Sequence, residues 1–351
     1  MNFKYLLLLG ILWFTVGTGK AQIASDSSKA KDDAILANKL YNESLLLSEG
    51  QKYIEAIGML NKAVRLRPDF SKAYYNRGCI NIKLKNFEDA LADINLSIDI
   101  EPSSEAMAAK GYIYLLKGDL QKANDALTLA LSDNDNNAMA LYYRGCVLML
   151  QSRNSAALAD FDRAISIKPD FALAYNERGC LYFEQGETER AKTDLTRAVT
   201  FDQTLAAGYN NLGKVHEKLD EMDAALEYFT TALRINREFA EAYLNRGKVY
   251  YKTGKYDEAV SDFNQSIELD GKNATAFNDL GMARYMSGDL NGAVESLSEA
   301  VNLDRNYAEA WLNRGIVREM LRDVKGACMD WSTAAELGHA DALKYITNQC
   351  Q

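Results

Sequence analysis

Small and large apolar residues recur along this chain with a period of 34 residues, shortened once to 33. Alanine returns nine times at one point of the period. A large apolar residue follows each of these alanines after four residues, and alanine or serine follows after seven. Such spacings place the side chains on one face of an α-helix. The nine alanines are Ala56, Ala90, Ala123, Ala157, Ala191, Ala225, Ala259, Ala293 and Ala327. The pattern predicts nine equivalent amphipathic helices.

Glycine marks a second helix in each unit. It recurs at Gly78, Gly111, Gly145, Gly179, Gly213, Gly247, Gly281 and Gly315. With this glycine as position 8, nine units start at residues 37, 71, 104, 138, 172, 206, 240, 274 and 308, and Ser44 occupies position 8 of the first. Each unit therefore holds a helix A, which contains the glycine, and a helix B, which contains the alanine.

Glycine and proline also mark the ends of these helices. Four glycines at position 15 predict the turn between helix A and helix B: Gly118, Gly186, Gly254 and Gly288. In the first unit we expect the turn glycine to shift to Gly50. The chain has three prolines, and all fall at position 32, after helix B.

Residue size along the unit predicts an all-α fold of nine helical hairpins. Small residues at positions 8, 20 and 27 allow close helix approach, and large residues at positions 4, 11, 24 and 28 fill the space around them. We assign the hairpins to residues 37–339. Residues 340–351 have one apolar face, formed by Ala340, Leu343 and Ile346, and are predicted to form a capping helix.

This unit resembles the tetratricopeptide repeat, and residues 240–273, AEAYLNRGKVYYKTGKYDEAVSDFNQSIELDGKN, match its pattern most cleanly. The resemblance implies a right-handed superhelical solenoid that binds other proteins or peptides. It also implies a concave groove lined by helix A at positions 2, 5, 6, 9, 12 and 13.

The N-terminal residues 1–21 have the layout of a secretory signal peptide. Lys4 precedes an apolar run from Leu6 to Val16, and Gly19 and Ala21 are small residues before a cleavage point. Eleven apolar residues are too few for a spanning anchor, which needs about 20. We therefore expect cleavage after Ala21, no membrane insertion afterwards, and a periplasmic or secreted protein. No cysteine lies near the cleavage point, so no lipoprotein signal is present.

Residues 22–36 are predicted to be a polar lead-in that runs into the start of the first helix, with residues 22–31 disordered.

Composition argues against several function classes. The net charge of −9 disfavours a nucleic-acid partner, which would require clustered positive charge. The two histidines, His216 and His339, are far apart, and the five cysteines show no CxxC spacing. We therefore expect no metal site, no cofactor and no catalytic residues.

Arginine at position 7 and aspartate at position 23 occur together in five repeats and are both absent from the other four. A catalytic or metal-binding role for the aspartates is the alternative, but each carboxylate comes with its own cation. We therefore predict structural ion pairs between helix A and helix B. The pairs are Arg77 with Asp93, Arg144 with Asp160, Arg178 with Asp194, Arg246 with Asp262, and Arg314 with Asp330.

The cysteines are of two kinds. Cys79, Cys146 and Cys180 share position 9 of helix A, and neighbouring helices lie too far apart for a disulfide between them, so we expect thiols. Cys328 and Cys350 meet if helix B of the ninth repeat and the capping helix run antiparallel, and we predict a disulfide between them. The C-terminal segment that contains both resembles those of bacterial envelope proteins with these repeats, which favours a periplasm.

The groove positions that the resemblance implies change character along the chain. They carry asparagines in several repeats, apolar and aromatic residues in repeats 3 to 5, and four lysines in repeats 6 and 7. The asparagines either hold an extended peptide backbone or simply solvate the helix. The candidate peptide-binding residues are Asn42, Asn76, Tyr112, Tyr142, Tyr143, Met149, Phe183, Asn210, Asn211, Lys214, Lys218, Asn245, Lys248, Lys252 and Asn313.

These residues predict a non-catalytic scaffold of the cell envelope that holds a protein or peptide in the concave groove. The expected partner carries an apolar segment beside an acidic one. The alternative is a structural subunit of an envelope secretion or assembly complex, which would use the convex face and the ends of the solenoid.

Overall fold

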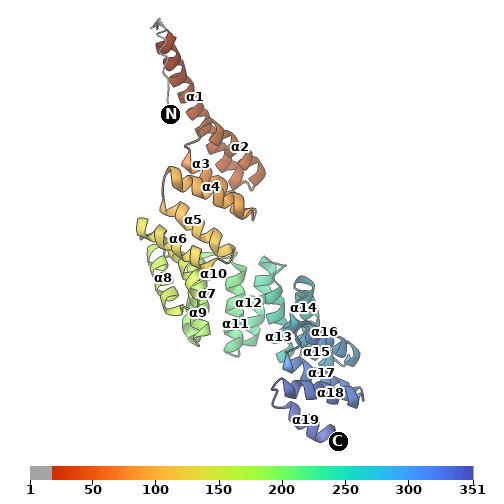
Figure 1. The fold of residues 1–351 in the computed structure, drawn as a ribbon. Helices are drawn as coiled ribbons and strands as arrows, with labels where there is room; N and C mark the ends of the chain where they lie inside the picture. The colour runs from red at the N-terminus through yellow and green to blue at the C-terminus, as the bar shows by residue number, and fades with distance from the viewer. Residues whose placement is uncertain (1–17, 351) are drawn as a thin grey trace, which may run out of the picture. The chain divides into compact units, whose positions relative to one another are not determined.

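The computed structural model describes residues 18–350, with side chains from residue 29 onward. This part of the chain contains nineteen helices and no strand (Figure 1). The chain divides into two compact units, residues 1–160 and 161–351, and the division falls inside α8 (Asn154–Ile167).

The helices have the following bounds. The N-terminal unit contains α1 (Thr18–Glu49), α2 (Tyr53–Leu66), α3 (Ser71–Lys83), α4 (Phe87–Ile100), α5 (Ser104–Leu116), α6 (Leu120–Asp133) and α7 (Ala138–Leu150). The C-terminal unit contains α9 (Ala172–Glu184), α10 (Thr188–Phe201), α11 (Ala206–Lys218), α12 (Met222–Ile235), α13 (Ala240–Lys252), α14 (Tyr256–Leu269), α15 (Ala274–Ser287), α16 (Leu290–Leu303), α17 (Ala308–Met320), α18 (Val324–Glu336) and α19 (Ala342–Gln349).

Consecutive helices form the hairpins of the repeating unit, and the predicted all-α class is confirmed. From the second repeat on, helix A begins at position 1 of its unit, and in all nine repeats helix B begins at position 17. Several of these starts are capped. Asp119, Asp289 and Asp323 each precede a helix B and accept a hydrogen bond from the backbone N–H three residues on.

The turn between helix A and helix B has one left-handed residue, at position 15, in every repeat. Four of the nine are the predicted glycines, with φ between 76° and 92°. The other five are Gln51, Lys85, Ser152, Asp220 and Arg322, with φ between 58° and 65°. The expected shift of the first turn to Gly50 is wrong, because Gln51 adopts the left-handed conformation at the ordinary position. The backbone turn is thus the same in all nine repeats even where the residue is unfavourable for it.

The core of each hairpin is a small residue facing a large one. A Cβ on Gly213 would lie 2.5 Å from Cε1 of Phe229, and a Cβ on Gly111 would lie 2.5 Å from Cγ of Leu127. Both distances are too short for a real contact, so position 8 must be small where position 24 is large. This interlock brings helix A and helix B together within one repeat.

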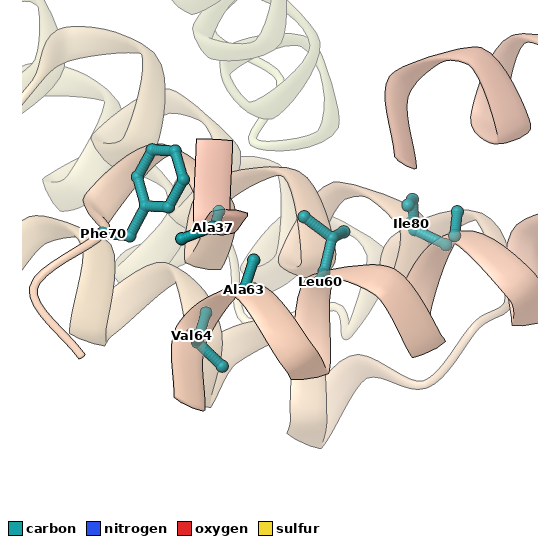
Figure 2. Packing of buried hydrophobic residues seen from close by; sticks show 8 residues of the cluster. Ala37, Leu60, Ala63, Val64, Phe70 and Ile80 are labelled. Atoms are coloured by element: carbon teal, nitrogen blue, oxygen red, sulfur yellow. The ribbon is translucent and has the colours of Figure 1, made fainter. Parts of the chain in front are cut away.

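The first repeat shows how neighbouring repeats share a hydrophobic core (Figure 2). Ala37 of α1 and Leu60 and Ala63 of α2 are fully buried, Phe70 closes the cluster from the end of the first repeat, and Ile80 contributes from the second. Burial of these apolar side chains contributes about 25 cal/mol per Å² of surface removed from water. Each repeat therefore completes its core with residues of the following one.

The N-terminal helix is longer than predicted. Helix α1 starts at Thr18 and includes residues 22–31, which we had predicted to be disordered. These residues are polar, but no glycine or proline occurs between Ala21 and Glu49, and alanine and lysine favour helix. Residues 1–21 are the predicted signal peptide. Of these, residues 1–17 lie outside the described residues, and residues 18–21 belong to the start of α1. None of the described helices combines the length and hydrophobicity that crossing a bilayer requires.

The C-terminal helix α19 packs on the ninth repeat. Tyr345 stacks on the buried ring of Trp331, with centroids 5.0 Å apart, and Ala342 is fully buried. Cys350, directly after α19, is joined to Cys328 of α18 by a disulfide, and the two Cα atoms lie 5.7 Å apart. This helix covers apolar surface that the last hairpin leaves open.

Candidate binding surfaces on helix A

The five arginine–aspartate pairs connect helix A to helix B within their repeats. In each pair Nε and Nη2 of the arginine donate to the two carboxylate oxygens of the aspartate, at 2.5–2.8 Å. The aspartates are 1–7% exposed. These hydrogen bonds raise the pKa of Arg77, Arg144 and Arg246. Both oxygens of each aspartate are thus used by the scaffold, which leaves them unsuited to catalysis or metal binding.

The third guanidinium nitrogen links a repeat to the one before it. In four of the five pairs Nη1 donates to the residue at position 25 of the preceding helix B: Asn61, Asp162, Thr230 and Ser298. One arginine therefore holds three helices together. This role was not predicted, although position 25 is polar in all of these repeats and could have suggested it.

The asparagines at position 6 are bound to the preceding repeat. Nδ2 of Asn211, Asn245 and Asn313 donates to Oδ1 of an asparagine at position 5 one repeat earlier, at 2.9–3.1 Å. Nδ2 of Asn76 donates to the hydroxyl of Tyr41, whereas Asn42 is exposed. One amide hydrogen of each bonded asparagine therefore stabilises the stacking of repeats, and its carbonyl oxygen is held in a fixed orientation.

The four groove lysines lie together in the C-terminal unit. Lys214, Lys218, Lys248 and Lys252 line one cavity of about 590 Å³, together with Phe183 and Asn245. Their relative placement agrees with the groove positions implied by the resemblance.

Three of these lysines, however, face carboxylates. Nζ of Lys214 lies 3.4 Å from Glu241, Nζ of Lys248 lies 3.7 Å from Asp279, and Lys252 donates to Glu217. The expectation of a basic groove in repeats 6 and 7 therefore needs correction. The acids occupy positions 2, 6 and 12 of helix A, which are groove positions too, so the sequence contained the signal.

Asp279 is the least well satisfied of these carboxylates. Asn278 donates to its Oδ1 at 3.3 Å, but its buried Oδ2 accepts no hydrogen bond from the described residues. Burial raises the pKa of Asp279, and the ammonium of Lys248 only partly offsets this. Asparagine, the usual residue at position 6, would avoid the charge.

Replacing Asp279 by asparagine is expected to stabilise the C-terminal unit by about 1 kcal/mol at neutral pH, because a buried unsatisfied charge is removed. When the pKa of a carboxyl is higher in the folded than in the unfolded protein, the protein becomes less stable as pH rises from the unfolded-state pKa to the folded-state pKa. The gain should therefore shrink as pH falls toward the ordinary carboxyl range. Urea unfolding at pH 5 and pH 7.5 measures it. Exposed Glu295→Gln serves as the control, and a loss of stability for Asp279→Asn would contradict the prediction.

The N-terminal unit has an apolar cavity of about 560 Å³ on the faces of its A helices. Tyr112 of α5 and Tyr143 of α7 stack on each other at its wall, with centroids 4.4 Å apart, and Tyr75 of α3 lines it as well. Burial raises the pKa of all three tyrosines. These hydroxyls stay protonated at physiological pH and can donate hydrogen bonds.

Two alanines explain why the cavity lies in this place. Ala108 and Ala109 occupy positions 5 and 6 of the third repeat and line the cavity. No other repeat has small residues at both positions; the second carries Tyr75 and Asn76, and the fourth carries Tyr142 and Tyr143. Missing bulk in the third repeat therefore leaves a hollow between the tyrosines of its neighbours.

The sequence located part of this cavity. Tyr112 and Tyr143 were predicted, and Tyr142 packs beside Tyr143 with centroids 5.4 Å apart. Met149 is half-buried and does not line the cavity, and Phe183 belongs to the lysine-lined cavity of the other unit. The lining residues that the prediction missed include Tyr75, Ile82, Lys83, Lys85, Phe87, Glu105, Ala108, Ala109 and Met139.

Three cysteines remain thiols in the structure: Cys79, Cys146 and Cys180. Burial raises the pKa of Cys79, and it raises the pKa of Cys180 to about 12. A thiol is a weak nucleophile compared with a thiolate, so these two side chains are poorly suited to covalent chemistry.

Comparison with protein families decides the class. Models described as tetratricopeptide repeat match residues 71–104, 204–272 and 238–306, and one described as TPR repeat matches residues 145–186 and 179–220. Together they cover more than half of the 351 residues. The chain belongs to the tetratricopeptide repeat family. Proteins of this family generally act as scaffolds that bind proteins or peptides.

Named relatives of this tetratricopeptide repeat chain match over part of its length. Human tetratricopeptide repeat protein 13 is 23% identical over 165 residues, which are 44% of this chain and 19% of that protein. The Hsp70-Hsp90 organizing protein of Triticum aestivum is 26% identical over 132 residues, 37% of this chain and 23% of that protein. The chain thus spans about a fifth of the length of these relatives.

Solved structures with the same fold include three of known origin or assembly. The APC/C hetero-tetramer Cut9-Hcn1 has a TM-score of 0.66 at 18% identity, over 76% of this chain and 52% of that one. The pilF protein of Pseudomonas aeruginosa has a TM-score of 0.55 at 23% identity, over 59% of this chain and 94% of that one. A tetratricopeptide repeat protein of Parabacteroides merdae has a TM-score of 0.52 at 22% identity, over 70% of this chain and 99% of that one. These likenesses support the fold.

Proposed function

We propose that this tetratricopeptide repeat protein is a non-catalytic scaffold that holds a segment of a partner protein against its A helices. One observation carries the proposal: the cavity of about 560 Å³ between the tyrosines of repeats 2, 3 and 4. Its volume falls in the range of about 300–1,000 Å³ that ligand pockets occupy. Its lining is mostly apolar, and aromatic residues in such hollows supply a large part of binding energy at interfaces.

The C-terminal unit contributes differently to this proposed function. Its helix A face mixes lysines with the carboxylates of Glu217, Glu241 and Asp279. A partner there must exchange existing ion pairs for new ones, which contributes selectivity more than affinity. We therefore assign the main anchoring contact to the N-terminal unit.

A place in the cell envelope, periplasmic or secreted, is part of the same proposal. It rests on the signal-like layout of residues 1–21 and on the Cys328–Cys350 pairing, which an oxidising compartment maintains. The partner is accordingly expected among envelope or extracellular proteins.

The test fills the cavity with residues that the chain itself uses elsewhere. The double variant Ala108→Asn/Ala109→Asn copies positions 5 and 6 of the sixth repeat, Asn210 and Asn211, so the scaffold is expected to fold. Immobilised wild type and variant are compared for proteins captured from an envelope fraction. A partner that the wild type captures and the filled variant loses is then purified, and its affinity for the variant should be at least tenfold weaker, about 1.4 kcal/mol.

Two further results separate this function from its alternative. Tyr112→Ala and Tyr143→Ala should speed dissociation of the same partner more than they slow its association, because apolar anchors act mainly after encounter. The filled variant and the wild type could instead capture the same partners equally well, in a fixed ratio of partner to chain that survives several washes. That result would indicate a structural subunit that uses other surfaces. Circular dichroism in the far ultraviolet confirms that each variant is folded.

A further inference from the structure

The cavity of repeats 2 to 4 has charges at its two ends. Lys83 is the last residue of α3, Lys85 lies in the turn after it, and both line the cavity. Glu105 is the second residue of α5 and lines it too. Short turns make consecutive helices antiparallel, so α3 and α5 run in the same direction. The lysines and the glutamate therefore lie at opposite ends of the A helices.

The two lysines differ from those of the other unit. No carboxylate of the described residues lies within ion-pair distance of Lys83 or Lys85, whereas Lys117 nearby is paired with Glu88 at 2.5 Å. Nζ of Lys83 lies 5.4 Å from the ring centroid of Tyr53, a cation–π contact that supplies no countercharge. In a chain of net charge −9, this end of an apolar cavity is an unneutralised positive site.

Lys85 also has an unfavourable backbone. It adopts φ 62° at position 15, where four repeats have glycine. Glycine would fit this conformation without steric cost, so the lysine side chain is not needed for the turn. The same holds for Gln51 in the first repeat, which has φ 58° and does not line the cavity.

We propose that the cavity binds a partner segment in which a large apolar side chain is adjacent to an acidic residue, with the apolar group between Tyr75, Tyr112 and Tyr143 and the carboxylate at Lys83 and Lys85. This inference rests on the proposed function and names the chemistry of its ligand. It moves the expected acidic contact away from the paired lysines of repeats 6 and 7 to the unpaired ones beside the tyrosines.

Three labelled heptapeptide amides test the proposal by fluorescence anisotropy with the full chain. The first has the sequence Gly-Ser-Phe-Asp-Asp-Ser-Gly, the second replaces both aspartates by lysine, and the third replaces the phenylalanine by serine. The first peptide should bind about tenfold more tightly than the second at low salt, with a smaller ratio at high salt. The third should bind at least tenfold more weakly than the first.

The double variant Lys83→Gln/Lys85→Gly should abolish the preference for the acidic peptide and leave the affinity for the lysine peptide unchanged or higher. Its Tm should not fall, because glycine suits the left-handed turn, and this excludes unfolding as the cause. Gln51→Gly makes the same backbone change away from the cavity and should keep the full preference.

The outcomes separate this inference from the function on which it rests. If both phenylalanine peptides bind equally well, and Ala108→Asn/Ala109→Asn weakens both, the cavity is a binding site but the acidic requirement is wrong. A preference for the lysine peptide would assign the dominant charge to Glu105 and also overturn the proposal. If no phenylalanine peptide binds up to millimolar concentration, the cavity does not take such a segment. Concentration-dependent dimerisation lost on filling the cavity would identify a second copy of the chain as the occupant.

Discussion

Replacing Asp330 by alanine is expected to lower the free energy of unfolding of the C-terminal unit by about 3–5 kcal/mol. Asp330 is 1% exposed and accepts hydrogen bonds from two arginines. Arg314 donates to both of its oxygens at 2.7 and 2.8 Å, and Arg318 donates to Oδ2 at 2.9 Å. The substitution leaves the buried guanidinium of Arg314 and the half-buried guanidinium of Arg318 without this carboxylate.

A matched control is available in the same unit. Asp162 also pairs with an arginine, Arg178, at 2.6 Å, but its side chain is 56% exposed. Asp162→Ala should therefore cost less than about 1 kcal/mol. Urea unfolding followed by the fluorescence of Trp311 and Trp331 reports on this unit. Equal costs for the two substitutions would show that burial does not set the strength of these pairs.

Loss of the Cys328–Cys350 disulfide is expected to destabilise the C-terminal end by about 3 kcal/mol. The bond joins residues 22 positions apart. In the chain-entropy model, closing a loop of that length lowers the entropy of the unfolded chain, which stabilises the folded state by about 3 kcal/mol. The variant Cys328→Ser/Cys350→Ser should release α19 from Trp331 at a lower urea concentration than the wild type, which hydrogen exchange of the α19 amides detects.

Counting thiols tests the pairing itself. Unfolded, unreduced protein should contain three reactive thiols and reduced protein five. In the folded protein Cys79 and Cys180 should react slowly at pH 8, because burial raises the pKa of each thiol. The variant with serine at residues 79, 146 and 180 should contain none before reduction. Five thiols in unreduced protein would exclude the disulfide.

The sequence was sufficient for the repeat because the repeat depends on residue size. Gly213 against Phe229 and Gly111 against Leu127 are contacts that an extra carbon would obstruct, so eight of the nine copies keep glycine at position 8, and the first has the small residue Ser44. The arginine–aspartate pairs were likewise readable, since both members appear together or not at all. The structure shows these pairs in the expected five repeats.

The candidate site was less predictable, for a physical reason. Its cavity arises from missing bulk at Ala108 and Ala109, and a sequence search for chemistry attends to side chains that are present. The lysines of repeats 6 and 7 were found, but their net effect depends on acids such as Glu241 and Asp279 that reach them from neighbouring repeats. Electrostatics at a groove is a property of several repeats together.

The position-15 turn shows a third limit. Four glycines predicted it, but five other residues take the same left-handed conformation because the helices on both sides impose it. Gln51 does so although Gly50 is adjacent. Tertiary packing here overrides the local preference of the residue.

The helix contacts of each unit join neighbours one or two places apart along the chain. Interfaces between segments that are close in sequence form early, because only a short length of chain must be ordered to close them. A chain that emerges N-terminus first can pack each hairpin on the previous one as it appears. The tyrosine-lined cavity can therefore form before the residues of the pair Arg314 and Asp330 have emerged.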